Sequence, residues 1–194
     1  VSWTPEDTLL TILPNDTIQF AVHARHQWAE QFDIDWWVDE GDTISNDTTV
    51  TIRFEELGEF IVYCSISDEN VSATRRWHVN TVEFYLRSFL PDTTNITTRR
   101  NTPIDLTLDV AFVDGIELEY TWSQTGRIEN HEFPNEDSIH VNYDLTGDYR
   151  ILAQITDGQR VIENDWNISI VSSLWWWWPH ELQMEVPNDT TMDF

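Results

Sequence analysis

Hydrophobic and polar residues alternate along most of the chain up to residue 171. A period of two predicts β-strands that bury one face, and no segment shows a convincing helical period. Residues 21–31 come nearest to a helical pattern, and we expect them to form a loop. The alternating sets in the first half are Ile18, Phe20, Val22; Ile34, Trp36, Val38; Val50, Ile52, Phe54; Phe60, Val62, Cys64, Ile66; and Trp77, Val79. Those in the second half are Ile104, Leu106, Leu108, Val110; Leu118, Tyr120, Trp122; Ile139, Val141, Tyr143; Tyr149, Ile151, Ala153, Ile155; and Trp166, Ile168, Ile170.

The two halves are copies of one unit. Residues 15–20 match 101–106 at an offset of 86, and residues 58–60 match 147–149 at an offset of 89. An insertion between the two blocks accounts for the change of offset. We therefore predict two tandem domains, 1–82 and 83–171.

Residues 172–194 resemble the opening of a third copy. Pro187-Asn188-Asp189-Thr190 repeats Pro14-Asn15-Asp16-Thr17, and the pattern aromatic-x-Pro recurs at Trp3, Phe89 and Trp177. We expect a Trp-rich linker followed by the first strands of a third repeat. The alternative is a strand pair that is donated to a neighbouring molecule.

Each unit has six or seven short strands separated by Asx, Gly and Pro turns, in about 86 residues. Short strands at this spacing predict a two-sheet antiparallel sandwich. The fold class we expect is therefore all-β: tandem immunoglobulin-like β-sandwiches.

One segment of each copy resembles a known family. The run 56–68 followed by Trp77-x-Val79, and its copy from Gly147 through Asp157 to Trp166-x-Ile168, are similar to the last strands of PKD-type and related immunoglobulin-like repeats. Such repeats occur in archaeal and bacterial cell-surface proteins. The resemblance implies the sandwich fold and a cell-surface location, but no particular chemistry, because this fold serves many functions.

Charge excludes some partners. The chain has 35 acidic and 10 basic residues, no lysine, and a net charge of −25. We therefore expect no nucleic-acid binding, which needs clustered cations, and no insertion into a membrane, since no long apolar run exists. A carboxylate-rich surface of this kind is typical of proteins that work in high salt, where screening reduces self-repulsion.

Six N-x-S/T sequons indicate a glycosylated extracellular or cell-surface protein. The chain's 12 Asn and 33 Ser plus Thr would give roughly two sequons by chance. The alternative is that these triplets are simply turn sequences. The candidate sites for N-linked glycans are Asn15, Asn46, Asn70, Asn95, Asn167 and Asn188.

No arrangement of residues predicts catalysis. His23 and His26 lack a third ligand at a recognisable spacing, and carboxylates are too abundant for a pair of them to indicate glycoside cleavage. The lone Cys64 lies in an apolar strand, where a buried, inert thiol is expected. We expect no enzyme activity and no cofactor, with calcium at the acidic clusters as an open alternative.

Tryptophan is the strongest remaining signal. Trp36, Trp77, Trp122 and Trp166 occupy equivalent core positions, but Trp37 and the run Trp175, Trp176, Trp177 and Trp178 have no core assignment. Four consecutive Trp in an extended segment point to both sides. They could form a wedge between domains, an interface with another molecule, or a platform for sugar rings.

Two functions remain open. The first is a structural subunit or spacer of a surface assembly, such as a filament, sheath, surface layer or appendage, whose partners are further copies or other assembly proteins. The second is adhesion to a polysaccharide or host surface, with Trp37, Tyr63 or the Trp run as the platform.

Overall fold

The computed structural model describes residues 1–25, 32–68, 71–126 and 133–172. These residues form fourteen strands and no helix. The first seven are β1 (Ser2–Thr4), β2 (Leu9–Ile12), β3 (Thr17–His23), β4 (Asp33–Val38), β5 (Thr49–Arg53), β6 (Gly58–Ser67) and β7 (Ser72–Thr81). The other seven are β8 (Phe84–Leu90), β9 (Asn95–Arg99), β10 (Ile104–Phe112), β11 (Glu119–Gly126), β12 (Ser138–Val141), β13 (Gly147–Thr156) and β14 (Val161–Val171).

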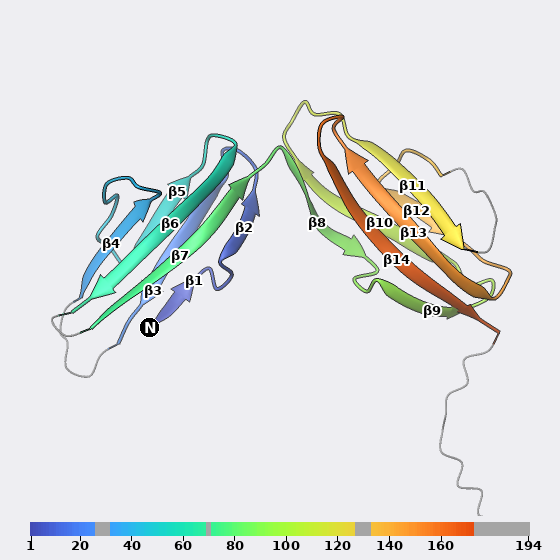
Figure 1. Ribbon diagram of the computed structural model, residues 1–194, viewed down its shortest axis with the longest axis horizontal. Helices are drawn as coiled ribbons and strands as arrows, with labels where there is room; N and C mark the ends of the chain where they lie inside the picture. The colour runs from blue at the N-terminus through green and yellow to red at the C-terminus, as the bar shows by residue number, and fades with distance from the viewer. Residues whose placement is uncertain (26–31, 69–70, 127–132, 173–194) are drawn as a thin grey trace, which may run out of the picture.

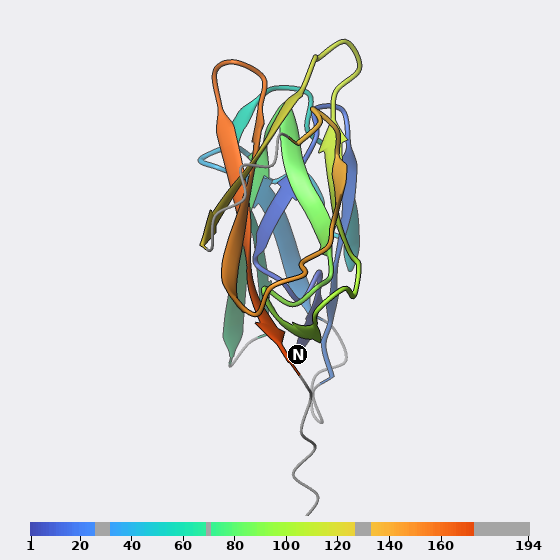
Figure 2. The same cartoon turned by 90° about the vertical axis from the view of Figure 1, so that its right-hand side faces the viewer.

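The strands form two sandwiches of the same topology. In the first domain, a sheet of order β1-β3-β5 faces a sheet of order β2-β7-β6-β4. The second domain repeats this with β8-β10-β12 and β9-β14-β13-β11. Figure 1 shows the two sandwiches, and Figure 2 shows β13 and β14 in a different layer from β8.

One pairing in each domain differs from the antiparallel arrangement that the sequence predicts. β2 runs parallel to β7, and β9 runs parallel to β14. After β1, the chain crosses through a short loop to the other sheet without reversing direction. β2 therefore pairs in parallel with β7, and β9 pairs in the same way with β14. The expected loop at 21–31 is also partly wrong, because Ala21, Val22 and His23 complete β3.

The alternating residues form two separate cores. Trp36 stacks on Trp77 with ring centroids 5.8 Å apart, and Trp122 stacks on Trp166 at 5.9 Å. The indole nitrogens of Trp77 and Trp166 donate hydrogen bonds to the carbonyl oxygens of Pro5 (2.9 Å) and Pro91 (3.2 Å). The repeated aromatic-x-Pro pattern therefore has a structural role, since its proline carbonyl holds the core indole in place.

The connection between the domains is short. β7 ends at Thr81 and β8 begins at Phe84. The Val82 N–H donates to the Ile12 carbonyl of the first domain (3.0 Å), and the Glu83 carbonyl accepts from the Val113 N–H of the second (3.0 Å). Each of the two connecting residues is thus hydrogen-bonded to one domain.

Candidate interaction surface

The outward side of the β2-β7-β6-β4 sheet is the candidate site, and we call it the first outer face. Its residues alternate with core residues along each strand, so they point away from the sandwich. Leu9, on β2, is 77% exposed although it is apolar. The face includes Leu9 and Thr11 of β2, Asp33, Asp35 and Trp37 of β4, Glu59, Ile61, Tyr63 and Ser65 of β6, and Thr74, Arg76, His78 and Asn80 of β7, with Asp39 directly after β4.

Trp37 and Tyr63 are stacked at the centre of this face. They are cross-strand partners of β4 and β6, and their rings lie 5.2 Å apart with an interplanar angle of only 7°. Each ring therefore covers part of the other, and both side chains are half-buried. Trp37 lies on this outward face, but its ring is not a freely exposed platform.

The first outer face carries opposite charges on its two sides. Each row across the sheet joins a residue of β4, one of β6 and one of β7. In consecutive rows, Asp35 and Trp37 of β4, and then Asp39 in the turn after β4, lie across from Thr74, Arg76 and His78 of β7. The Ile61 N–H donates to Asp39 Oδ1 at 2.7 Å. Arg76 and His78 make no side-chain hydrogen bond or ion pair with any residue that the structure describes. In these three rows, acidic groups lie on the β4 side and basic groups on the β7 side, with Ser65, Tyr63 and Ile61 of β6 between them, and Glu59 occupies the next row of β6.

The equivalent face of the second domain, the second outer face, has a different chemistry. Ser123 replaces Trp37, Leu152 replaces Tyr63, and Arg150 replaces Ile61. Its polar groups are paired within the face: Arg150 Nε donates to Asp165 Oδ2 at 2.8 Å. Likewise, Gln154 Nε2 donates to Glu163 Oε1 at 2.7 Å, and Ser169 Oγ donates to Asp148 Oδ1 at 2.7 Å.

Two sequons lie side by side on the second outer face. Asn95 of β9 and Asn167 of β14 are register partners, both are exposed, and Asn167 Nδ2 donates to Asn95 Oδ1 at 3.5 Å. In the first domain the same two positions hold Leu9 and His78. Glycans at this pair would cover the second outer face, whereas the first outer face has one sequon beside it, Asn46, whose Nδ2 contacts Asp35.

The other sequons are more scattered. Asn15 lies in an exposed turn with φ of 71°, and its Oδ1 accepts a hydrogen bond from Arg53 Nη2 at 2.8 Å. Asn46 is exposed, but its Nδ2 donates both to the Ile34 carbonyl (3.0 Å) and to Asp35 Oδ1 (2.7 Å). Asn70 and Asn188 lie outside the described residues. Glycosylation at all six positions stays a prediction.

The Trp run lies outside the described part of the chain, as does His26. Trp175, Trp176, Trp177 and Trp178 therefore stay a predicted interface. The expected core positions of Trp36, Trp77, Trp122 and Trp166 are confirmed, since these side chains are at most 7% exposed.

Two buried ionisable groups in the described residues have strongly raised pKa values. Burial, with a smaller contribution from Asp35, raises the pKa of the Cys64 thiol from 9.0 to about 12. Burial raises the pKa of Tyr143 from 10.0 to about 12 as well, with a contribution from Tyr149. Both shifts keep the groups neutral and unreactive. Within the described ranges no cluster of three or more His, Cys, Asp or Glu residues could hold a metal ion.

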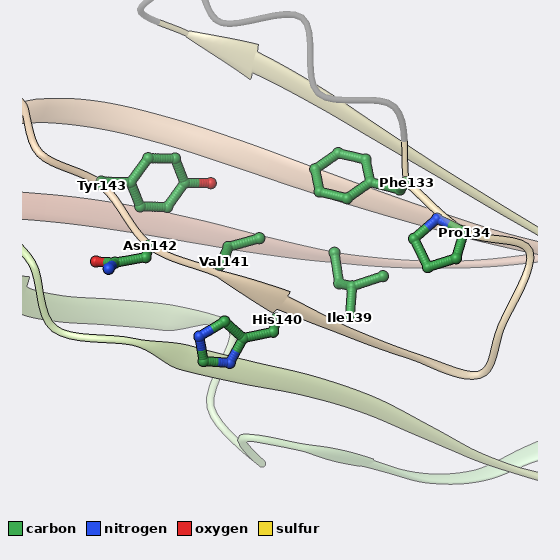
Figure 3. A pocket seen from close by; sticks show the side chains of 7 residues that line it. All are labelled: Phe133, Pro134, Ile139, His140, Val141, Asn142 and Tyr143. Carbon is green, nitrogen blue, oxygen red and sulfur yellow. The ribbon is translucent and has the colours of Figure 1, made fainter.

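The hollow in Figure 3 is the open side of the second sandwich, with a volume of about 160 Å³. Phe133, Ile139, Val141 and Tyr143 lie on one side of β12, and His140 points to the other. His140 Nδ1 lies 2.7 Å from Asp105 Oδ1 on the exposed side of the sheet. Ile139, Val141 and Tyr143 are core residues, 5% exposed each. Pro134, His140 and Asn142 complete the lining, and the Tyr143 hydroxyl already donates a hydrogen bond to Gln124 Oε1.

Comparisons with known proteins concern the fold alone. No family model matches the chain, and no curated protein matches it. Among solved structures, it is similar to fibronectin(III)-like modules of Clostridium thermocellum CbhA, at 10% identity and a TM-score of 0.37, covering 87% of this chain and 93% of that one. Three N-terminal domains of the bacteriophage RB49 highly immunogenic outer capsid protein match at 15% identity and 0.35, covering 82% and 56%. The N-terminal four Ig domains of Dscam1 isoform 6.9 match at 13% identity and 0.36, covering 87% and 45%.

The predicted fold class, tandem immunoglobulin-like β-sandwiches, is confirmed by the strands and their order. The first outer face was only partly predictable. The sequence singles out Trp37 and Tyr63, but not Leu9, Ile61, Arg76 or His78. The alignment of the two repeats could have identified these four residues. At each of their positions the first copy is apolar or basic, and the second copy carries a sequon or a paired polar group.

The described residues form no helix that could span a membrane.

Proposed function

We propose that this chain is a non-enzymatic subunit or spacer of an extracellular surface assembly, glycosylated and adapted to a salt-rich setting. We further propose that its domains are of the PKD type known from archaeal or bacterial surface proteins. The observation that carries the proposal is the tandem pair of sandwiches with its two-residue connection, hydrogen-bonded on both sides at Val82 and Glu83. A connection of only two residues leaves few rotatable bonds between the domains, which suits a spacer or an array subunit.

The surface chemistry supports the same proposal. The net charge of −25 keeps isolated molecules apart in dilute salt, and screening at high ionic strength removes this barrier. Exposed sequons at Asn15, Asn95 and Asn167 suit a protein that faces the outside. The buried Cys64 thiol and the two apolar cores suit a structural role.

Sedimentation velocity over a range of protein concentrations, in dilute salt and in about 1 M NaCl, tests the proposal. The Debye length, over which charges act on each other, is about 30 Å at 0.01 M salt and about 3 Å at 1 M salt. We expect association that grows with both salt and protein concentration, and that weakens when Trp175, Trp176, Trp177 and Trp178 are replaced by alanine. A chain that stays monomeric at high concentration in 1 M NaCl would contradict a homotypic assembly.

The stacked pair Trp37 and Tyr63 favours a second candidate, adhesion to a polysaccharide or host surface. Aromatic rings on an outward sheet face provide apolar area with polar groups at the rim. Glycan-dependent quenching of tryptophan fluorescence that is lost in Trp37→Ala would support adhesion. No quenching across a broad glycan panel would count against it.

A further inference from the structure

We propose that the first outer face pairs with the first outer face of a second copy of this chain, about a two-fold axis that runs parallel to the strands above β6. This inference rests on the proposed function, because it names the surface through which copies would associate. Its basis is the distribution of charge across the rows of the β2-β7-β6-β4 sheet.

The rows make the face complementary to itself. A two-fold axis along β6 places each row of one copy over the same row of the other copy, in the opposite order. β7 of one copy therefore lies over β4 of the other. His78 then faces Asp39 of the second copy. Arg76 faces Trp37 of the second copy and lies between Asp35 and Asp39 of that strand. Each of these contacts occurs twice.

The contacts match in kind as well as in sign. A guanidinium over an indole ring is a favourable cation–π pair, and two flanking carboxylates add charge-assisted contacts. Arg76 is free for such contacts, because it pairs with no side chain in the described part of its own chain. Ile61 and Tyr63, on the axis, would each meet the same residue of the other copy and provide the apolar centre.

The second outer face lacks each of these features. Arg150 occupies the position of Ile61 and is already bound to Asp165. Ser123 replaces the indole, and Asp165 replaces Arg76, so the charges on the two sides are no longer opposite. Asn95 and Asn167 place two sequons on this face, whereas the first outer face has one sequon, Asn46, at its β4 edge. The pairing therefore belongs to the first domain only.

The size of the face predicts a weak contact. Three overlapping strands, β7, β6 and β4, spaced about 4.8 Å apart and about 20 Å long, cover about 300 Å² on each partner. The total of about 600 Å² is below the size of stable dimers, so the pair should be reversible. Weak contacts of this kind become effective when they are repeated many times, as in an array.

Charge reversal tests the pairing on the full chain in about 1 M NaCl, where only contact charges act. We expect Arg76→Glu to weaken self-association at least about tenfold, because the two-fold axis duplicates the lost contact and the introduced carboxylate lies close to the carboxylates of the partner. Arg150→Glu makes the same charge change on the second outer face and should leave self-association unchanged. Circular dichroism and thermal unfolding establish that both variants are folded.

A mixing experiment distinguishes pairing from loss of structure. Asp35→Arg alone should also weaken self-association, because it places a cation near Arg76 of the partner. A mixture of the Asp35→Arg and Arg76→Glu chains should associate more strongly than either variant alone, since each supplies the charge that the other lacks.

The outcomes separate the pairing from the proposed function. If the unmodified chain associates and Arg76→Glu associates equally well, the pairing is wrong while the assembly function stands and uses another surface. If the mixture shows no rescue, direct contact between these charges is wrong. If the unmodified chain does not associate at all, both the pairing and the homotypic assembly fail.

Discussion

The two domains share a core and differ on the outside. Their strand orders are the same, and the indole stacks at the two centres have nearly the same geometry, 5.8 and 5.9 Å between centroids. Their outer faces, in contrast, carry a stacked aromatic pair with unpaired basic groups in one domain and paired polar groups with sequons in the other, within the residues that the structure describes. The comparison shows which positions the fold requires and which are available for function.

The largest effect should come from the positions that the domains share. Trp166→Ala removes a fully buried ring and its hydrogen bond to Pro91, and should cost the second domain about 3–5 kcal/mol. Trp77→Ala should do the same to the first domain. Hydrogen exchange followed by peptide mass spectrometry assigns the loss of protection to each half. Equal loss in both halves on either substitution would show that the domains do not unfold separately.

A smaller effect on stability is expected where the two cores have different residues at equivalent positions. In the second domain the buried Tyr143 hydroxyl donates to Gln124 Oε1 at 3.1 Å. The equivalent positions of the first domain hold Phe54 and Val38, an apolar pair. Gln124→Val should destabilise the second domain by about 1–3 kcal/mol, because it leaves the hydroxyl buried without a partner.

Adding Tyr143→Phe to Gln124→Val should recover most of that stability. The double variant reproduces the apolar pair of the first domain, and the coupling is measured by chemical denaturation of all four chains in the cycle. Additive effects of the two substitutions would mean that the hydrogen bond contributes nothing.

A gain of about 1 kcal/mol is expected at Thr81. Its side chain is 2% exposed, and its hydroxyl has no partner within the described residues. The second domain has Ile170 at this position. Thr81→Val keeps the shape and removes the unpaired hydroxyl. Calorimetry should show a higher Tm for the first domain only, and a lower Tm would indicate that the hydroxyl has a partner in solution.

The last difference between the domains acts only at alkaline pH. The pKa of Cys64 is raised from 9.0 to about 12, so the first domain should be fully stabilised by the neutral thiol below pH 9 and lose this contribution as the pH rises through 12. In the second domain Ala153 holds the same position. Cys64→Ala should abolish this part of the alkaline loss, which denaturation at about pH 8 and about pH 11 measures. An unchanged alkaline loss in Cys64→Ala would rule out the thiol as its source.

Sequence periodicity predicted the cores well, because burial acts on every second residue of a strand and the repeat supplied each pattern twice. All the alternating residues from Ile18 to Ile170 point inward as expected, and they are buried or half-buried. The parallel pairing of β2 and β9 was missed, since alternation reports which face is buried and not the direction of the neighbouring strand. Most of the first outer face was missed for a related reason. In the sequence, Arg76 and His78 cannot be distinguished from other surface residues, and only the strand register places them in the same rows as Trp37 and Asp39.

Chemical cross-linking tests most directly whether only the first domain turns its outer face to a second copy. Ile61→Cys places a thiol on the proposed axis, and Arg150→Cys places one at the equivalent position of the second domain. Facing sheets lie about 10 Å apart, too far for a disulfide but within reach of a short bismaleimide, and the buried Cys64 should not react. We predict cross-linked dimers from Ile61→Cys and none from Arg150→Cys. Equal yields from both variants, or none from Ile61→Cys under conditions where the chain associates, would contradict this account.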